Sequence, residues 1–102
     1  METTVTTHGA QATIRLAGRF DFNAHREFRS AVDPVLAMTE VSEIRVDLNN
    51  VDYLDSSALG MLLMVRDKAK SAGGRTVVIA NAKAGVRHVL DIANFGKLFT
   101  MV

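Results

Sequence analysis

The sequence of 102 residues contains no cysteine, no tryptophan and only one proline. Without cysteine the chain has no disulfide scaffold, no thiolate nucleophile and no cysteine-based zinc site. Its three histidines, His8, His25 and His88, are far apart, and none has the paired spacing of a helical metal site. We therefore expect neither a metal ion nor a cofactor.

Strong charge and long hydrophobic runs are missing as well. Twelve basic and eleven acidic residues leave a net charge of +1, so no field attracts nucleic acid or anionic lipid. The longest apolar run, 58–65, is interrupted by Gly60 and is far shorter than the roughly 20 residues that span a bilayer. The first residues are polar and unlike a signal peptide. These absences predict a cytoplasmic protein that binds neither nucleic acid nor membranes.

The chain does have enough hydrophobic residues, 48%, to form one core. The length favours a single domain, 1–102. Alternating and β-branched runs predict strands, and apolar residues at 3.6-residue spacing predict helices. We expect strands at 3–7, 12–17, 43–48 and 75–80, an edge strand at 98–102, a loop at 49–55, and helices starting near Asn23, Ser56 and Lys83, the last capped by Asn81.

This order predicts an α/β fold with a mixed sheet of four or five strands and about three helices packed mainly on one face. The second helix should run from Ser56 to about Ala72 and end at Gly73-Gly74. The predicted core comprises Phe28, Val32, Ile44, Val46, Leu62, Val65, Val77, Ile79, Val86 and Leu90.

The most informative segment is 51–60, Val-Asp-Tyr-Leu-Asp-Ser-Ser-Ala-Leu-Gly, which opens the second helix. In the simplest interpretation, Asp55, Ser56 and Ser57 cap the helix by satisfying free backbone N–H groups. In a functional interpretation, one serine hydroxyl accepts a phosphoryl group, because the positive end of a helix stabilises a phosphate. The two interpretations are compatible.

A helical wheel separates the two sides of this helix. Ala58, Leu62, Val65, Ala69 and Ala72 should face the sheet. The opposite side carries small and polar residues with an exposed methionine, a composition that suits partner binding because methionine adapts its shape. This side comprises Ser57, Gly60, Met64, Asp67 and Ser71, with Ser56 and Leu63 on its flank.

Enzymatic alternatives have less support. The segment lacks the Gly-x-Ser-x-Gly motif of a nucleophile elbow, and Gly73-Gly74 is not followed by the Lys-Ser of a phosphate-binding loop. Asp47, Asp52 and Asp55 are candidates for a magnesium site, although solvated loop carboxylates and a helix cap explain them more simply. We predict that the protein is not an enzyme.

The segment around Asp55-Ser56-Ser57-Ala58-Leu59-Gly60 resembles the STAS domain of bacterial anti-sigma-factor antagonists. The resemblance extends over nearly the whole chain, including the turn 18–21 and the helix residues 86–90. It implies that Ser56, the serine directly after the aspartate, is phosphorylated by a partner serine kinase that is also the anti-sigma factor. A cognate phosphatase would reverse the modification.

The resemblance and the wheel together predict a phosphorylation-regulated binding protein. Unphosphorylated at Ser56, it would bind the anti-sigma factor and release the target of that factor. The predicted partner-binding residues are Asp21, Asp55, Ser57, Gly60, Leu63, Met64 and Asp67. The alternative is a constitutive STAS subunit of a transport or signalling complex that docks through the same helix without phosphorylation.

Overall fold

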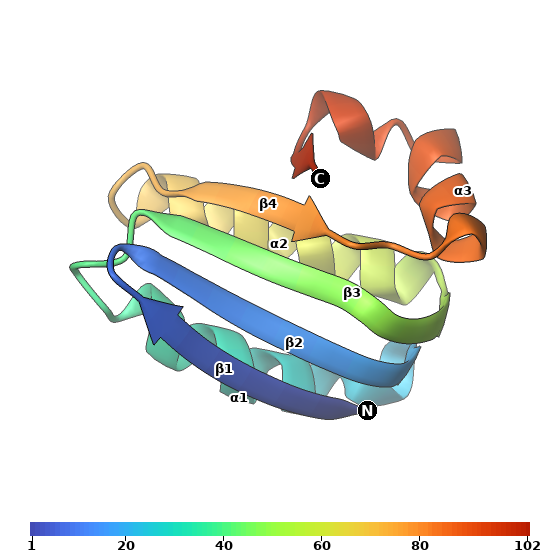
Figure 1. The fold of residues 1–102 in the computed structure, drawn as a ribbon, viewed down its shortest axis with the longest axis horizontal. Coiled ribbons are helices and arrows are strands. Elements are labelled where there is room, and N and C mark those ends of the chain that lie inside the picture. The colour runs from blue at the N-terminus through green and yellow to red at the C-terminus, as the bar shows by residue number, and fades with distance from the viewer.

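The computed structural model describes all residues, 1–102, as one α/β domain (Figure 1). Its elements in chain order are β1 (Glu2–His8), β2 (Gln11–Phe20), the 3-10 turn η1 (Phe22–Ala24), α1 (His25–Leu36), β3 (Glu43–Leu54), α2 (Ser56–Ser71), β4 (Thr76–Ala80), α3 (Ala84–Ile92), the 3-10 turn η2 (Phe95–Lys97) and β5 (Thr100–Met101).

The five strands form one mixed sheet in the order β1-β2-β3-β4-β5. A hairpin joins β1 and β2 as an antiparallel pair, and the remaining neighbours are parallel. In Figure 1 the strands lie in front, with α1 and α2 behind them, and α3 lies beyond the end of β4. The predicted mixed sheet with three helices mainly on one face is therefore confirmed.

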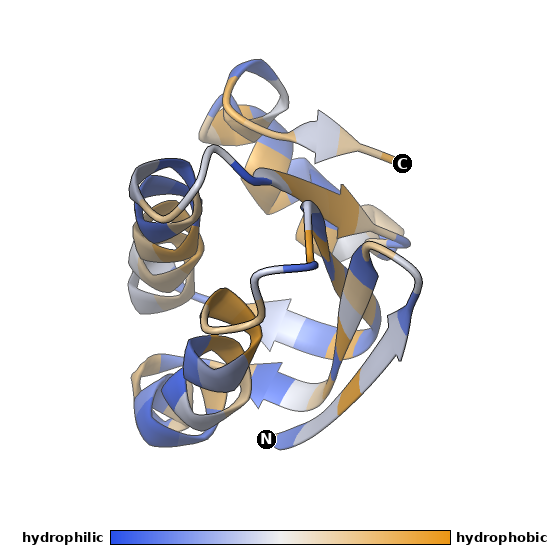
Figure 2. Cartoon of the chain, turned by 90° about the vertical axis from the view of Figure 1, so that its left-hand side faces the viewer, coloured by the Kyte–Doolittle hydropathy of each residue, from blue (hydrophilic) through white to orange (hydrophobic).

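The core lies between the sheet and the helices, where Figure 2 shows hydrophobic colour on the facing sides of strands and helices. Alternation along β2 and β3 directs one set of side chains inward, and Ile14, Ile44 and Val46 are fully buried there. All ten residues predicted for the core are buried, and they belong to one cluster of 26 residues. The cluster also contains Met61, which the helical wheel did not place in the core.

Strand β3 is longer than predicted. Residues 49–55 were expected to form a loop, but the strand continues to Leu54. It does so because β2 also extends to Phe20 and pairs with it, from Ala17 opposite Asn50 to Phe20 opposite Leu54, with two register shifts. Val51 and Leu54 are buried, which anchors the extension. As a result, a single residue separates β3 from α2.

Two local predictions on later elements are wrong. Asn81 does not cap α3, because its backbone is left-handed with φ of 61° and the helix has its N-cap at Lys83. Its side chain amide instead donates to the Asp47 carboxylate at 3.3 Å. Ala72, expected to face the sheet, is exposed because α2 ends at Ser71 and the chain turns away through Gly73 and Gly74, both at positive φ.

A buried arginine fixes the connection between α1 and β3. The Arg75 guanidinium donates hydrogen bonds to the backbone carbonyls of Val41 at 2.9 Å, Leu36 at 2.5 Å and Met38 at 2.8 Å. Arg75 is the only charged residue in the buried set. Because buried carbonyls are costly when unpaired, this one side chain stabilises a connection that has no regular secondary structure.

Candidate functional site

The candidate site lies at the N-terminus of α2, where the chain leaves β3. Asp55 has extended backbone and occupies the N-cap position, and its Oδ1 accepts a hydrogen bond from the Ala58 N–H at 3.0 Å. Its own N–H donates to the Phe20 carbonyl at 3.3 Å, which ties the cap to β2. Asp55 is therefore a structural cap held by the sheet, as predicted, whereas the side chains of Ser56 and Ser57 make no capping hydrogen bond.

Ser56 and Ser57 occupy the first two helical positions, and both are exposed. The first N–H groups of a helix have no partner within it, and the Asp55 carboxylate satisfies only that of Ala58. The N–H groups of Ser56 and Ser57 are thus available to an anion. The structure therefore provides an exposed hydroxyl beside free donors at the positive end of a sixteen-residue helix.

The three carboxylates considered as a magnesium site do not act together. Asp55 caps α2, Asp52 pairs with Lys83 Nζ at 2.7 Å, and Asp47 accepts from the Asn49 N–H at 2.9 Å. No group of three or more His, Asp or Glu side chains in the chain is arranged to hold a metal ion. Each of these three carboxylates has a local structural partner of its own.

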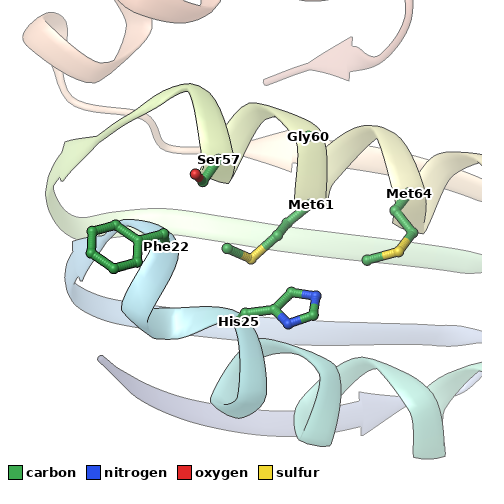
Figure 3. A pocket seen from close by; sticks show the side chains of 6 residues that line it. All are labelled: Phe22, His25, Ser57, Gly60, Met61 and Met64. Atoms are coloured by element: carbon green, nitrogen blue, oxygen red, sulfur yellow. The ribbon is translucent and has the colours of Figure 1, made fainter.

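A groove of about 370 Å³ lies beside the two serines, between α2 and the start of α1 (Figure 3). Its residues are Phe22, His25, Ser57, Gly60, Met61 and Met64. In Figure 3 the side chains of His25, Met61 and Met64 converge on the space between the two segments, and Phe22 and Ser57 lie at one end. We call this feature the α1–α2 groove.

The turn before α1 positions the aromatic end of the groove. Asp21 Oδ1 accepts a hydrogen bond from the Asn23 N–H at 3.0 Å and starts η1. Phe20 points into the core and is fully buried, whereas Phe22, on the turn, is 68% exposed. This exposed aromatic ring beside the groove is available for contact with a partner, and aromatic residues are enriched in protein interfaces.

The structure brings together only some of the predicted partner-binding residues. Ser57, Gly60 and Met64 line the groove, and Gly60 is exposed as predicted. Met64 was expected to be exposed but is half-buried, because it lies along the groove wall. Leu63 packs partly against the core.

Asp21 and Asp67 also lie outside the groove. The Asp21 carboxylate is engaged by the η1 cap and lies 3.6 Å from Arg19 Nε. Asp67, further along α2, is exposed and lies 3.6 Å from Arg66.

Sequence reasoning missed Phe22, His25 and Met61 as groove residues. The wheel treated α2 alone, whereas the groove depends on how α1 packs beside it. The available signal was the predicted turn and helix cap around Asp21, which place Phe22 just outside the preceding strand.

Residues 3–102 match the family model described as "Mlab, STAS domain". The chain belongs to the STAS-domain family. A STAS-domain containing protein of Pseudomonas aeruginosa (strain UCBPP-PA14) is 48% identical over 91 residues, covering 89% of this chain and 87% of that protein. An anti-sigma F factor antagonist of Lysinibacillus sphaericus is 26% identical over 83 residues, covering 81% and 70%.

The fold is also that of solved STAS-family proteins. The Bacillus cell fate determinant SpoIIAA in its phosphorylated form superposes with a TM-score of 0.73 at 20% identity, covering 99% of this chain and 91% of that one. Proteins named as anti-sigma factor antagonists are thus among the relatives and the structural neighbours of this STAS domain. None of its helices is long and apolar enough to cross a membrane.

Proposed function

We propose that this STAS domain is a phosphorylation-controlled binding protein of the bacterial cytoplasm. Unphosphorylated at Ser56, it docks on an anti-sigma factor that is also a serine kinase and releases the target of that factor. Phosphorylated, it dissociates, and a phosphatase resets it. The observation that carries the proposal is the exposed Ser56 hydroxyl at the first position of α2, directly after the Asp55 cap.

The chemistry requires little from this chain. The Ser56 Oγ attacks the γ-phosphorus of ATP bound to the kinase, the new O–P bond forms as the bond to ADP breaks, and a base on the kinase takes the hydroxyl proton. The chain supplies an accessible acceptor on a rigid element. In the product, the free N–H groups of Ser56 and Ser57 and the helix dipole favour the phosphate by about 0.3–1 kcal/mol.

Phosphorylation changes the charge of the docking surface more than its shape. The phosphate adds about −1.5 to −2 charges at pH 7, directly beside the Asp55 carboxylate. A partner surface complementary to the unmodified site would then face added negative charge, and like-charge juxtaposition in an interface costs several kcal/mol. This arrangement supports release without refolding of the domain.

The α1–α2 groove supports the docking half of the proposal. It contains an exposed phenylalanine and two methionines next to the acceptor helix turn. Exposed aromatic side chains provide much of the binding energy in protein interfaces, and methionine adapts to different partners. We propose that an apolar side chain of the anti-sigma factor enters this groove while the kinase site covers Ser56.

The modification is tested by kinase-dependent labelling from radioactive ATP. Ser56→Ala should abolish the label, whereas Ser57→Ala should retain it. Both variants should keep the wild-type free energy of unfolding within about 0.5 kcal/mol, because Asp55 provides the cap. Label that persists in Ser56→Ala and disappears in Ser57→Ala would move the acceptor to Ser57, and label in both would exclude this helix turn.

The switch is tested by affinity capture with three baits. Wild type and Ser56→Ala should capture the kinase, and Ser56→Asp should capture less of it, although a carboxylate imitates only part of a phosphate. Equal capture by all three, with no phosphate on protein taken from cells, would support the constitutive-subunit alternative instead.

A further inference from the structure

The outer edge of β1 is the least protected part of the sheet. β1 is an edge strand of seven residues, Glu2–His8, and pairs only with β2 (Figure 1). Proteins usually protect edge strands with lysine, proline, a bulge or short length, because free N–H and C=O groups invite another strand. β1 contains neither lysine nor proline and pairs with β2 without a register shift. The opposite edge, β5, is protected by being only two residues long.

The residues of β1 are complementary to a second copy of themselves. In an antiparallel pair around a two-fold axis at Val5, the residue numbers of opposite positions add up to ten. Val5 then faces Val5, Thr4 faces Thr6, Thr3 faces Thr7, and Glu2 faces His8, which pairs all seven residues. Val–Val and Thr–Thr pairs stabilise antiparallel sheets, and the imidazole N–H of His8 can donate to the Glu2 carboxylate.

The charged and polar side chains at the two ends of this pairing are free in the single chain, whereas Thr6 Oγ1 accepts a hydrogen bond from Arg15 Nη1 at 3.0 Å. Glu2 and His8 are exposed and form no ion pair or side-chain hydrogen bond within it. Val5 is 37% exposed although it lies opposite the fully buried Ile14, on the side of the sheet that faces the helices. Across the two-fold axis the two Val5 side chains would cover each other on that side.

We propose that β1 is a self-association edge, through which two copies of the chain form an antiparallel, two-fold symmetric dimer with one continuous sheet. The axis is perpendicular to the sheet, so both copies keep their helices on the same side. A strand of seven residues is only about 24 Å long and covers less area than a standard interface, so the dimer exchanges rapidly. The Ser56 helix turn belongs to a different part of the molecule, and the proposal does not depend on phosphorylation.

Cysteine cross-linking tests the register directly, because the chain has no cysteine of its own. A disulfide requires Cα atoms within about 7 Å of each other. Val5→Cys should therefore form a disulfide dimer under mild oxidation at least about tenfold faster than Thr7→Cys, since two Thr7 positions lie about 14 Å apart in this register. A mixture of Thr3→Cys and Thr7→Cys chains should form the mixed dimer faster than either variant forms its own.

Charges introduced at Val5, on the two-fold axis, provide a second, independent test in sedimentation measurements over a range of concentrations. The unmodified chain should show reversible dimerisation, and Val5→Lys and Val5→Glu should each be monomeric. Their equimolar mixture should dimerise again, because opposite charges directly across a strand pair attract. Circular dichroism melts establish that each variant is folded.

Two results would overturn the proposal. One is a chain that stays monomeric up to its solubility limit. The other is equal cross-linking of Val5→Cys, Thr3→Cys and Thr7→Cys, which indicates random collision of exposed thiols.

Discussion

The Asp55 carboxylate accepts a hydrogen bond from the Ala58 backbone N–H at 3.0 Å, while its own N–H is bonded to the Phe20 carbonyl of β2. One residue thus joins the sheet, the helix and the proposed acceptor, and substitutions can separate its roles. Asp55→Asn keeps a capping oxygen and removes the charge, whereas Asp55→Ala removes both. We expect Asp55→Ala to lower the free energy of unfolding by about 1 kcal/mol and Asp55→Asn to lower it by much less.

Chemical denaturation measures this difference, and kinase labelling of the same two variants shows whether the charge itself is needed for recognition. Equal destabilisation by both substitutions would mean that the charge of Asp55, rather than its cap geometry, stabilises the helix.

Phe22 should contribute to partner binding and hardly at all to stability. Because its side chain is 68% exposed, Phe22→Ala should change the free energy of unfolding by no more than about 0.5 kcal/mol. Affinity for the captured kinase should fall at least about tenfold if the ring enters the interface. The matched control is Ile92→Ala, because Ile92 is 70% exposed and lies on α3, outside the groove. A similar loss of affinity in both variants would place the docking surface elsewhere.

Gly60 should show opposite effects on stability and binding. It lies inside α2, and a Cβ added there meets no atom within 4 Å. Gly60→Ala should therefore raise the free energy of unfolding by about 0.5–1 kcal/mol through better helix propensity. The added methyl group projects from the groove wall and should weaken capture of the partner.

The comparison variant for Gly60 is Gly85→Ala. Gly85 is also helical, also has free space for a Cβ, and lies outside the groove. Gly85→Ala should leave capture of the partner unchanged. If Gly60→Ala binds as well as wild type, the partner does not approach this turn of α2.

Removing the Arg75 side chain should destabilise the whole domain. Arg75→Met leaves three carbonyls, those of Leu36, Met38 and Val41, without their donors. We expect a loss of about 1–3 kcal/mol or more in the free energy of unfolding. Lys70→Met is the control, because Lys70 is exposed and its side chain makes no hydrogen bond or ion pair in the chain. A loss below 0.5 kcal/mol for Arg75→Met would indicate that water replaces the guanidinium.

The fold was predictable from sequence because its signals are local and repeated. Alternation along 43–48 and the β-branched run at 76–79 mark the central strands, and Gly73-Gly74 marks the end of α2. The extension of β3 to Leu54 was not predictable in this way. It depends on pairing with β2, a segment more than 30 residues away in sequence, and polar Asn49 and Asn50 hide it.

The site was predictable to the extent that it belongs to a single helix. The position of Ser56 and Ser57 after a capping aspartate follows from the order of residues alone. The groove does not follow from the order of residues. His25 lines it from α1, and Met61 lines it while also packing in the core. A helical wheel assigns each side chain to one side of the helix, whereas a long flexible side chain such as methionine can contact both the groove and the core.

The α1–α2 groove is made of two segments, 22–25 and 57–64, which lie far apart in the chain and are brought together by the folded core. A partly unfolded chain presents neither wall in place, so a partner that uses the groove recognises only the native state. Binding then shifts the folding equilibrium by mass action and lowers the population open to proteolysis. The lifetime of this protein in the cell would consequently follow the supply of unoccupied partner, and each release event would return the chain to the pool exposed to proteases.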